Sequence, residues 1–270
     1  MIHTRMPRVW FAVPMAVALL LAGGMLLPTV WSSAEAPPAP APPSASVAPP
    51  APAVPTPTSA APIPVAQNPL ALPGKVPVHG SGKFDYASGQ SKIFGTRGAV
   101  RRFRVAVERG SNEDVAEFAA QVEATLGDSR SWIGDGRLRL QRVAGTVPAS
   151  FTVYLATRDT AGRMCRDGGV DIVVGGRPYT SCRTTGRAII NLDRWRLSAA
   201  PYLAARVPLA VYRQYVVNHE VGHELGRQHE GCPKRGGPAP VMVQQTLTLR
   251  GCVPYAWPRR GGRSLRGAAV

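Results

Sequence analysis

The stretch that decides both fold and chemistry is HEVGHELGRQH, residues 219–229. On a helix, residues four positions apart lie on one face, so His219 and His223 point the same way. Two imidazoles arranged like this can bind one zinc ion at about 2.0–2.1 Å. Glu220 lies one residue further round, where it can take a proton from a water bound to that ion. The stretch therefore predicts a zinc site with Glu220 as general base.

A third ligand requires the helix to stop. His229 cannot lie on the continuous helix face that carries His219 and His223. Gly226 can adopt the positive φ of a sharp helix-ending turn, which would let His229 approach the metal from outside the helix. Three protein ligands leave a fourth position open for water, and that arrangement is typical of catalytic zinc sites.

The full pattern, HExxHxxGxxH, resembles the signature of the metzincin clan of zinc metallopeptidases, in which a methionine turn follows the third histidine. The matching methionine is Met242, thirteen residues after His229. The resemblance implies that Met242 forms a hydrophobic floor under the metal. It also implies an α+β fold with a mixed sheet, a backing helix and an active-site helix, followed by an irregular C-terminal subdomain.

Neighbouring positions refine this resemblance. Glu230 stands where astacin-like members carry a structural glutamate that is not a ligand. Gln244 stands where astacins place a tyrosine that approaches the metal, so the chain is not a typical astacin. The Pro/Ala-linked, exported arrangement, with Gly231-Cys232-Pro233 after the histidines, resembles an uncharacterised exported actinobacterial family that is metzincin-like.

The remaining pattern predicts an α+β order of elements. Ser111 and Asp114 resemble a capping box that opens a helix running to about Leu126. A second helix, from about Pro208 to Leu225, carries the histidine motif. Apolar patterning predicts strands at 103–107, 137–144, 150–156, 170–174 and 188–192. By the metzincin resemblance, the strand at 170–174 or 188–192 is the sheet edge that pairs with extended substrate.

The N-terminus reads as an export segment. Arg5 and Arg8 precede an apolar run over residues 9–30, and Ala34-Glu35-Ala36 is a possible cleavage site. The run is also about long enough to span a bilayer, so residues 1–36 are either a signal peptide or a membrane anchor. Either alternative places the folded part outside the cytoplasm, secreted or membrane-anchored.

A linker follows, and then a single domain. Residues 37–74 are almost entirely Pro, Ala, Ser, Val and Thr, a composition that cannot bury enough apolar surface to fold. We therefore expect a disordered spacer there and a metzincin-like peptidase domain over residues 75–270. We expect this domain to be monomeric.

The chain has four cysteines, Cys165, Cys182, Cys232 and Cys252. An even number in an exported chain predicts disulfides, with three possible pairings. Cys165–Cys182 and Cys232–Cys252 are favoured because each closes a modest local loop. Cys232 also lies three residues after His229, so a thiolate ligand to the metal is a weaker alternative.

The formal net charge is +16, and all but four of the 32 basic residues are arginine. Export argues against a nucleic-acid partner, although basic composition alone can indicate one. Attraction to anionic cell-envelope polymers or lipids is a possible consequence, and a plain solvated surface is the simpler one. The arginines are scattered apart from one cluster, Arg259, Arg260, Arg263 and Arg266.

Three functions compete at this stage. The favoured one is an active zinc peptidase, because a binding module has no need of the base Glu220. The alternatives are an inactive zinc-binding module that recognises envelope polymers and an amidase that hydrolyses cell-wall peptide. The sequence does not separate peptidase from amidase or name a substrate.

Overall fold

A computed structural model describes residues 69–270, and the predicted signal or anchor segment and most of the predicted linker lie outside this range. Residues 69–74, which the composition assigned to the linker, contact the folded body. The N–H of Leu72 donates to the carbonyl of Arg196 (2.7 Å), and the carbonyl of Pro69 accepts from Leu209 (2.8 Å). The folded part therefore begins before residue 75.

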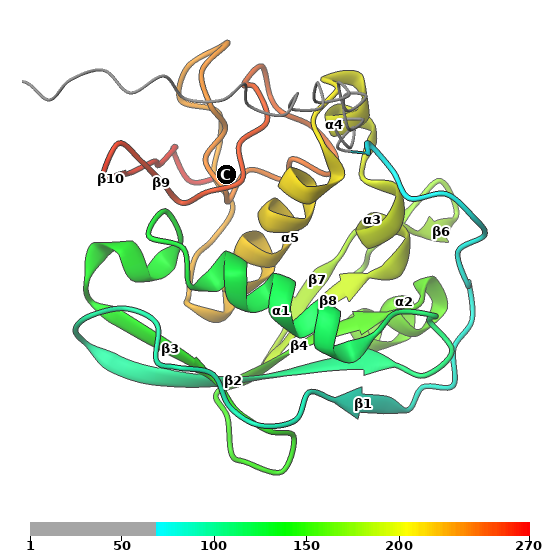
Figure 1. The fold of residues 1–270 in the computed structure, drawn as a ribbon. Helices are drawn as coiled ribbons and strands as arrows, with labels where there is room; N and C mark the ends of the chain where they lie inside the picture. Colours follow the sequence, from blue (N-terminus) through cyan, green and yellow to red (C-terminus); the bar gives the residue numbers. More distant parts are fainter. Residues whose placement is uncertain (1–68) are drawn as a thin grey trace, which may run out of the picture. The chain divides into compact units, whose positions relative to one another are not determined.

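The fold is α+β, built on one mixed sheet (Figure 1). Its strands are β1 (Phe84–Tyr86), β2 (Ala99–Glu108), β3 (Leu138–Arg142), β4 (Phe151–Ala156), β7 (Cys182–Thr184) and β8 (Arg187–Asn191). Two short hairpins stand apart from it, β5 (Val173–Val174) with β6 (Arg177–Pro178), and β9 (Arg259–Arg260) with β10 (Arg263–Ser264). The helices are α1 (Val115–Leu126), α2 (Arg158–Asp167), α3 (Leu192–Leu197), α4 (Ala200–Ala204) and α5 (Leu209–Glu224), with a 3₁₀ turn η1 (Trp132–Asp135).

The sheet runs β1-β2-β4-β8-β7, and β3 also pairs with β2. The pairs β2–β3, β2–β4 and β4–β8 are parallel, whereas β1–β2 and β7–β8 are antiparallel. The strand expected at 188–192 is thus β8, which lies inside the sheet, and the strand expected at 170–174 is reduced to the two residues of β5. Neither is the sheet edge that was predicted to face substrate. The strand at the sheet edge beside β8 is β7, which has three residues and is too short to show a sequence pattern.

The two faces of the sheet are covered by different helices. Alternate residues of β8 divide between two apolar clusters: Ala188 and Ile190 join the main core with α1 and α5, while Ile189 joins a smaller core with α2. This alternation is the period-two geometry of a strand buried on both sides. The helix α2 was not predicted, because its polar sequence offers few apolar positions at helical spacing.

The helix α1 begins later than the predicted cap. Asp114 is the N-cap, and its carboxylate accepts the N–H of Glu117 at 2.8 Å. Ser111 lies outside the helix, where its hydroxyl accepts from Glu113. The predicted end near Leu126 is correct, since Gly127 is the C-cap.

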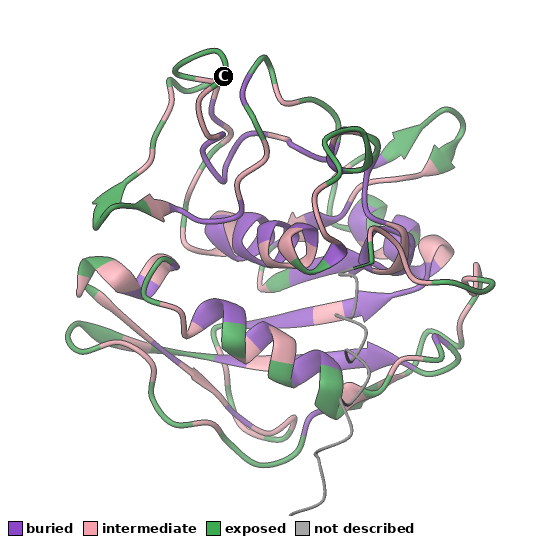
Figure 2. Cartoon of the chain, turned by 45° about the horizontal axis from the view of Figure 1, so that its top comes forward, coloured by how far each residue is buried: buried purple, intermediate pink, exposed green. Residues whose placement is uncertain are grey.

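The helix α5 is enclosed on both sides. One side packs on the sheet, and the irregular C-terminal segment, orange to red in Figure 1, covers the other. Figure 2 shows α5 mostly buried between these two layers. Among residues 69–270 no helix has the length and apolar character needed to cross a membrane.

Both disulfides form with the favoured pairing. Cys165–Cys182 joins α2 to the edge strand β7. Cys232–Cys252 closes the irregular segment, and Cys252 packs with Ala239 and Val243 on either side of the turn that carries Met242. All four cysteines form disulfides, so Cys232 has no free thiolate to offer a metal.

Replacing the second pair, Cys232→Ser with Cys252→Ser, should lower the free energy of unfolding by about 3 kcal/mol, because the bridge spans 20 residues. Urea unfolding measures this loss. The matched control is Cys165→Ser with Cys182→Ser, which opens a span of 17 residues elsewhere. Only the first variant should speed hydrogen exchange at residues 239–243. Equal exchange there in both variants would contradict the bracing role.

Candidate metal centre

The candidate metal centre lies at the C-terminal end of α5, where the chain turns sharply. Gly226 has a φ of +81°, in the left-handed region. Its N–H donates to the carbonyl of His223 (3.0 Å), and the N–H of Arg227 donates to that of Gly222 (2.9 Å). These two bonds form a Schellman motif, which satisfies carbonyls at the helix end and reverses the chain. The sequence predicted a helix-ending turn with positive φ at Gly226, and the structure has this turn there.

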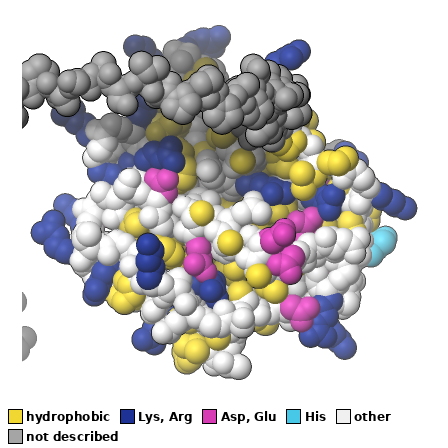
Figure 3. Space-filling model, viewed as in Figure 1, with side chains coloured by type: hydrophobic (Ala, Val, Ile, Leu, Met, Phe, Trp, Pro, Cys, Tyr) yellow, Lys and Arg dark blue, Asp and Glu magenta, His cyan; other side chains and the backbone are white. Residues whose placement is uncertain are grey.

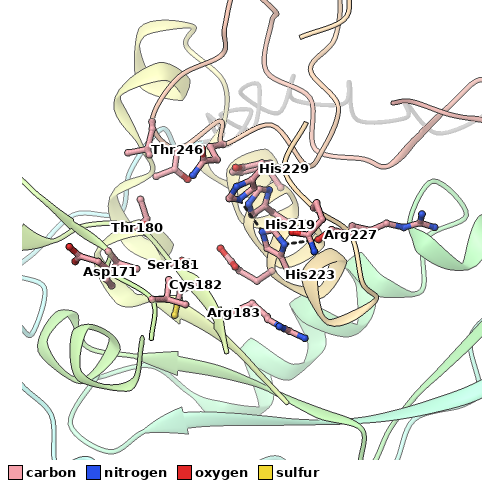
Figure 4. Close-up of a pocket in the computed structure, with 17 residues that line it drawn as sticks. Asp171, Thr180, Ser181, Cys182, Arg183, His219, His223, Arg227, His229 and Thr246 are labelled. Carbon is pink, nitrogen blue, oxygen red and sulfur yellow. Dashed lines mark hydrogen bonds between the residues drawn. The ribbon is translucent and has the colours of Figure 1, made fainter. Parts of the chain in front are cut away.

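The reversal brings the three histidines together (Figure 4). Their possible ligand atoms all lie within 4.8 Å of one another, and these residues are the one group of this kind found in residues 69–270. The Nε2 atoms of His223 and His229 are 3.1 Å apart. Tetrahedral zinc with bonds of 2.0–2.1 Å separates two ligand nitrogens by about 3.3–3.4 Å, so the spacing fits one shared ion.

Two backbone carbonyls fix how the imidazoles are turned. Nδ1 of His219 lies 2.8 Å from the carbonyl oxygen of Val241, and Nδ1 of His223 lies 2.8 Å from that of Arg227. A carbonyl only accepts, so each Nδ1 carries the proton and each Nε2 keeps its lone pair. Metal-binding histidines typically donate the ring N–H that does not face the metal to a carbonyl or carboxylate in this way.

The turn that carries Met242 is held against the same helix. The N–H of Val243 donates to the carbonyl of Pro240 at 3.0 Å, which closes a β-turn. The carbonyl of Met242 accepts from Glu230 (3.1 Å), next to the third histidine. A Cβ on Gly222 would lie only 2.6 Å from the sulfur of Met242. Met242, which is 1% exposed, therefore packs directly against α5 between the two histidine positions.

Burial sets the electrostatics of the site. It lowers the pKa of His219 to about 3, with a smaller contribution from His223. It also lowers the pKa of His223 and of His229, so all three rings are neutral at pH 7, the form that binds a metal. Burial alone raises the pKa of Glu220, which is 5% exposed, to about 8.

Two other glutamates near the histidines, Glu224 and Glu230, have structural contacts. Glu224 accepts from the guanidinium of Arg183 and from the N–H of Arg187, both at 3.0 Å, and so holds α5 to the β7–β8 hairpin. The carboxylate of Glu230 pairs with Arg266 and accepts the N–H of Gly267 (3.0 Å). Neither carboxylate belongs to the histidine cluster.

A cavity of about 260 Å³ opens over the three histidines and Glu220. Its far wall comes from the segment before β7 and from β7 itself, and Asp171, Thr180 and Ser181 lie across the space from the imidazoles (Figure 4). Gln244 and Thr246, which follow the Met242 turn, close another side. The cavity therefore lies between α5 and the edge of the sheet.

Some contributors to the site had no signal in the sequence. The carbonyls of Val241 and Arg227 act through the backbone, which residue types do not reveal. Tyr215 lines the cavity, donates to the carbonyl of Val243 (3.0 Å) and accepts from Gln245 (2.8 Å). Gly222 did offer a signal, since a glycine inside a helix often marks a close approach.

Comparison with known proteins adds a family. The family model described as "Protein of unknown function (DUF3152)" matches residues 71–254. The chain belongs to this family. The region that it shares with the family contains the three histidines, Met242 and both disulfides, and it ends before β9. No curated protein and no solved structure matches the chain.

Gly226→Ala should destabilise this family member by about 1–2 kcal/mol, because the left-handed conformation strains a side chain with Cβ. It should also weaken metal binding, because the turn positions His229 and the carbonyl of Arg227. The matched control is Gly226→Asn, since asparagine tolerates this conformation better. Unfolding and Zn²⁺ titration measure both effects. Equal metal affinity for Gly226→Ala and the parent protein would contradict the role of the turn.

Proposed function

We propose that the protein is an extracytoplasmic zinc peptidase of the metzincin type, with His219, His223 and His229 as ligands and Glu220 as general base. The observation that carries the proposal is the convergence of three neutral imidazoles at one point. Two of them are oriented by backbone carbonyls that hold Nδ1 and leave Nε2 free.

The donor set favours zinc. Three imidazoles with an open fourth position are typical of catalytic zinc, and the disulfides remove competing thiolates. When bound, zinc acts as a Lewis acid that polarises the scissile carbonyl and makes water a better nucleophile at neutral pH.

The role of Glu220 follows from its position. It is adjacent to His219 on α5 and lines the same cavity, with its carboxylate shielded from bulk water. With a pKa of about 8 in the absence of metal, Glu220 is mostly protonated at pH 7, and a bound dication would favour its ionised form. The carboxylate can then take the proton of the attacking water and give it to the nitrogen of the leaving amine. Glu224 and Glu230 are engaged by arginines and backbone N–H groups, so they do not compete for this role.

The metzincin assignment rests on four features together. These are the helix end at Gly226, the third histidine beyond it, the β-turn with buried Met242 against α5, and a mixed sheet followed by an irregular segment. We assign Met242 as the methionine of a Met-turn. Gln244 in place of a tyrosine separates the chain from typical astacins.

An extended peptide is the substrate class that fits the cavity. Strand β7 pairs with β8 on one side only, and Cys182 and Arg183 of β7 line the cavity. A peptide can add to such an edge through backbone hydrogen bonds and pass over the histidines. The disulfides and the basic, apolar N-terminus support action outside the cytoplasm, after secretion or from a membrane anchor.

Purified protein should bind one zinc ion per chain. His229→Ala should reduce the stoichiometry to well below one, because this ligand comes from outside the helix and has no substitute nearby. Metal analysis after dialysis measures this. The matched control is His79→Ala, an exposed histidine outside the cluster. Unchanged zinc content in His229→Ala would contradict the ligand set.

Glu220→Gln should reduce peptide hydrolysis by roughly 10²–10⁴-fold and leave zinc content unchanged, because it removes a base and not a ligand. Glu224→Gln is the matched control on the same helix and should retain most activity, since its amide still offers an oxygen to Arg187. The assay is an unbiased peptide library with and without chelator. Chelator-sensitive turnover that survives in Glu220→Gln would overturn the mechanism, and cleavage of cell-wall peptide alone would favour an amidase.

A further inference from the structure

A second cavity, of about 330 Å³, lies beside the helix-ending turn and plays no part in the proposed catalysis. Its lining includes five arginines from separate parts of the chain, Arg101, Arg137, Arg227, Arg259 and Arg266. Asp135 is the one acidic residue among those that line it. On the face drawn in Figure 3, by contrast, Lys and Arg side chains are spread over the surface. Convergence in a cavity is therefore the informative feature, and not the net charge.

The positive charge of Arg227 has no ion-pair partner among the described residues. The side chain of Arg227 points away from the three imidazoles (Figure 4). Its Nε is buried and has no hydrogen-bond acceptor among the described residues. Arg227 also lines the cavity, so its guanidinium adds unpaired positive charge there.

The C-terminal hairpin adds a second, independent sign. Gly261 and Gly262 have φ values of +55° and +73°, which make a tight two-residue turn. The register then places Arg260 directly opposite Arg263. Like charges at facing positions destabilise a hairpin, and a bound anion would offset the repulsion. Both side chains belong to exposed residues, so the positive charge continues from the cavity onto the surface.

Arg259 is held in place at the cavity before any ligand arrives. A Cβ on Gly134 of η1 would lie 2.8 Å from Cδ of Arg259, so the absence of a side chain there makes room for the arginine stem. The hydroxyl of Tyr255 donates to the carbonyl of Arg259 at 2.9 Å. The guanidinium itself donates to the carbonyl of Gly262 and to the hydroxyl of Ser264 (3.4 Å). These bonds use part of its donor capacity and hold it in place, which reduces the entropy lost on binding.

We propose that this cavity and the β9–β10 hairpin form a binding site for a flexible polyanion with repeated oxyanions, phosphate or carboxylate. Guanidinium groups bind both through paired hydrogen bonds. Arg266 is paired with Glu230. Arg101 and Arg259 each donate to a backbone carbonyl, which leaves their charge unneutralised. Together with Arg137, Arg227, Arg260 and Arg263 they are more positive charges than one small anion can pair with. This cavity is distinct from the histidine cavity, although Arg227 lines both. The proposed binding does not depend on peptidase activity.

The test is fluorescence anisotropy of the full chain in neutral detergent, with labelled polyphosphate, labelled polyglutamate of equal charge and unlabelled inorganic phosphate as competitor. We expect one polymer to bind at low salt, to release at high salt and to resist competition by inorganic phosphate. Arg137→Gln with Arg259→Gln should weaken binding by about tenfold or more, because each loses a charge-assisted hydrogen bond. Arg137→Gln alone should give part of the loss without disturbing the hairpin, because this exposed side chain has no hydrogen-bond or ion-pair partner within residues 69–270.

The matched control is Arg166→Gln with Arg177→Gln, two exposed arginines that line neither cavity. It removes the same charge and should change affinity by less than about twofold. The polymer that binds more tightly identifies phosphate or carboxylate as the oxyanion. Equal loss in the control pair, absence of polymer binding, or equal affinity for inorganic phosphate would overturn the proposal. Tighter binding of a single-stranded oligonucleotide through the same arginines would replace it with a nucleic-acid site.

Discussion

The cluster of three histidines depends on the pair of backbone hydrogen bonds that ends α5 at Gly226. Without them the helix continues and His229 leaves the face shared by His219 and His223. The same turn also delivers the carbonyl of Arg227 to Nδ1 of His223. Glycine adopts this local conformation at little cost, and the turn thus places one proposed ligand and orients another.

The second half of the site comes from the irregular segment after the helix. In the β-turn at 240–243, the carbonyl of Val241 accepts a hydrogen bond from Nδ1 of His219, and the carbonyl of Met242 accepts one from the N–H of Glu230. The side chain of Met242 packs into the space left by the missing Cβ of Gly222. This segment has little regular structure to hold it. The disulfide Cys232–Cys252 and the buried hydroxyl of Tyr215 do so instead.

The sequence predicted the parts of the protein whose physics is local. The i, i+4 histidines, the glycine turn, the strand spacing of β2, β4 and β8, and the disulfide loops all follow from short-range geometry. It failed where the outcome depends on tertiary context. The edge position of β7 is determined by the order of strands in the sheet. The polar helix α2 is stabilised by packing of a few small residues. The imidazole rings are oriented by backbone carbonyls, which every residue type carries. The boundary near residue 75 was misplaced because Pro69 and Leu72 are anchored by backbone bonds, and linker-like composition hides such bonds.

The central claim is that three imidazoles, fixed by these two turns, share one metal ion. The most direct measurement is an anomalous difference map at the zinc absorption edge from crystals of the zinc-loaded protein. We expect a single strong peak about 2.0–2.1 Å from Nε2 of His219, His223 and His229, with a non-protein ligand completing the site. A peak at an Nδ1 atom, at only two of the histidines, or at a site away from them would contradict it.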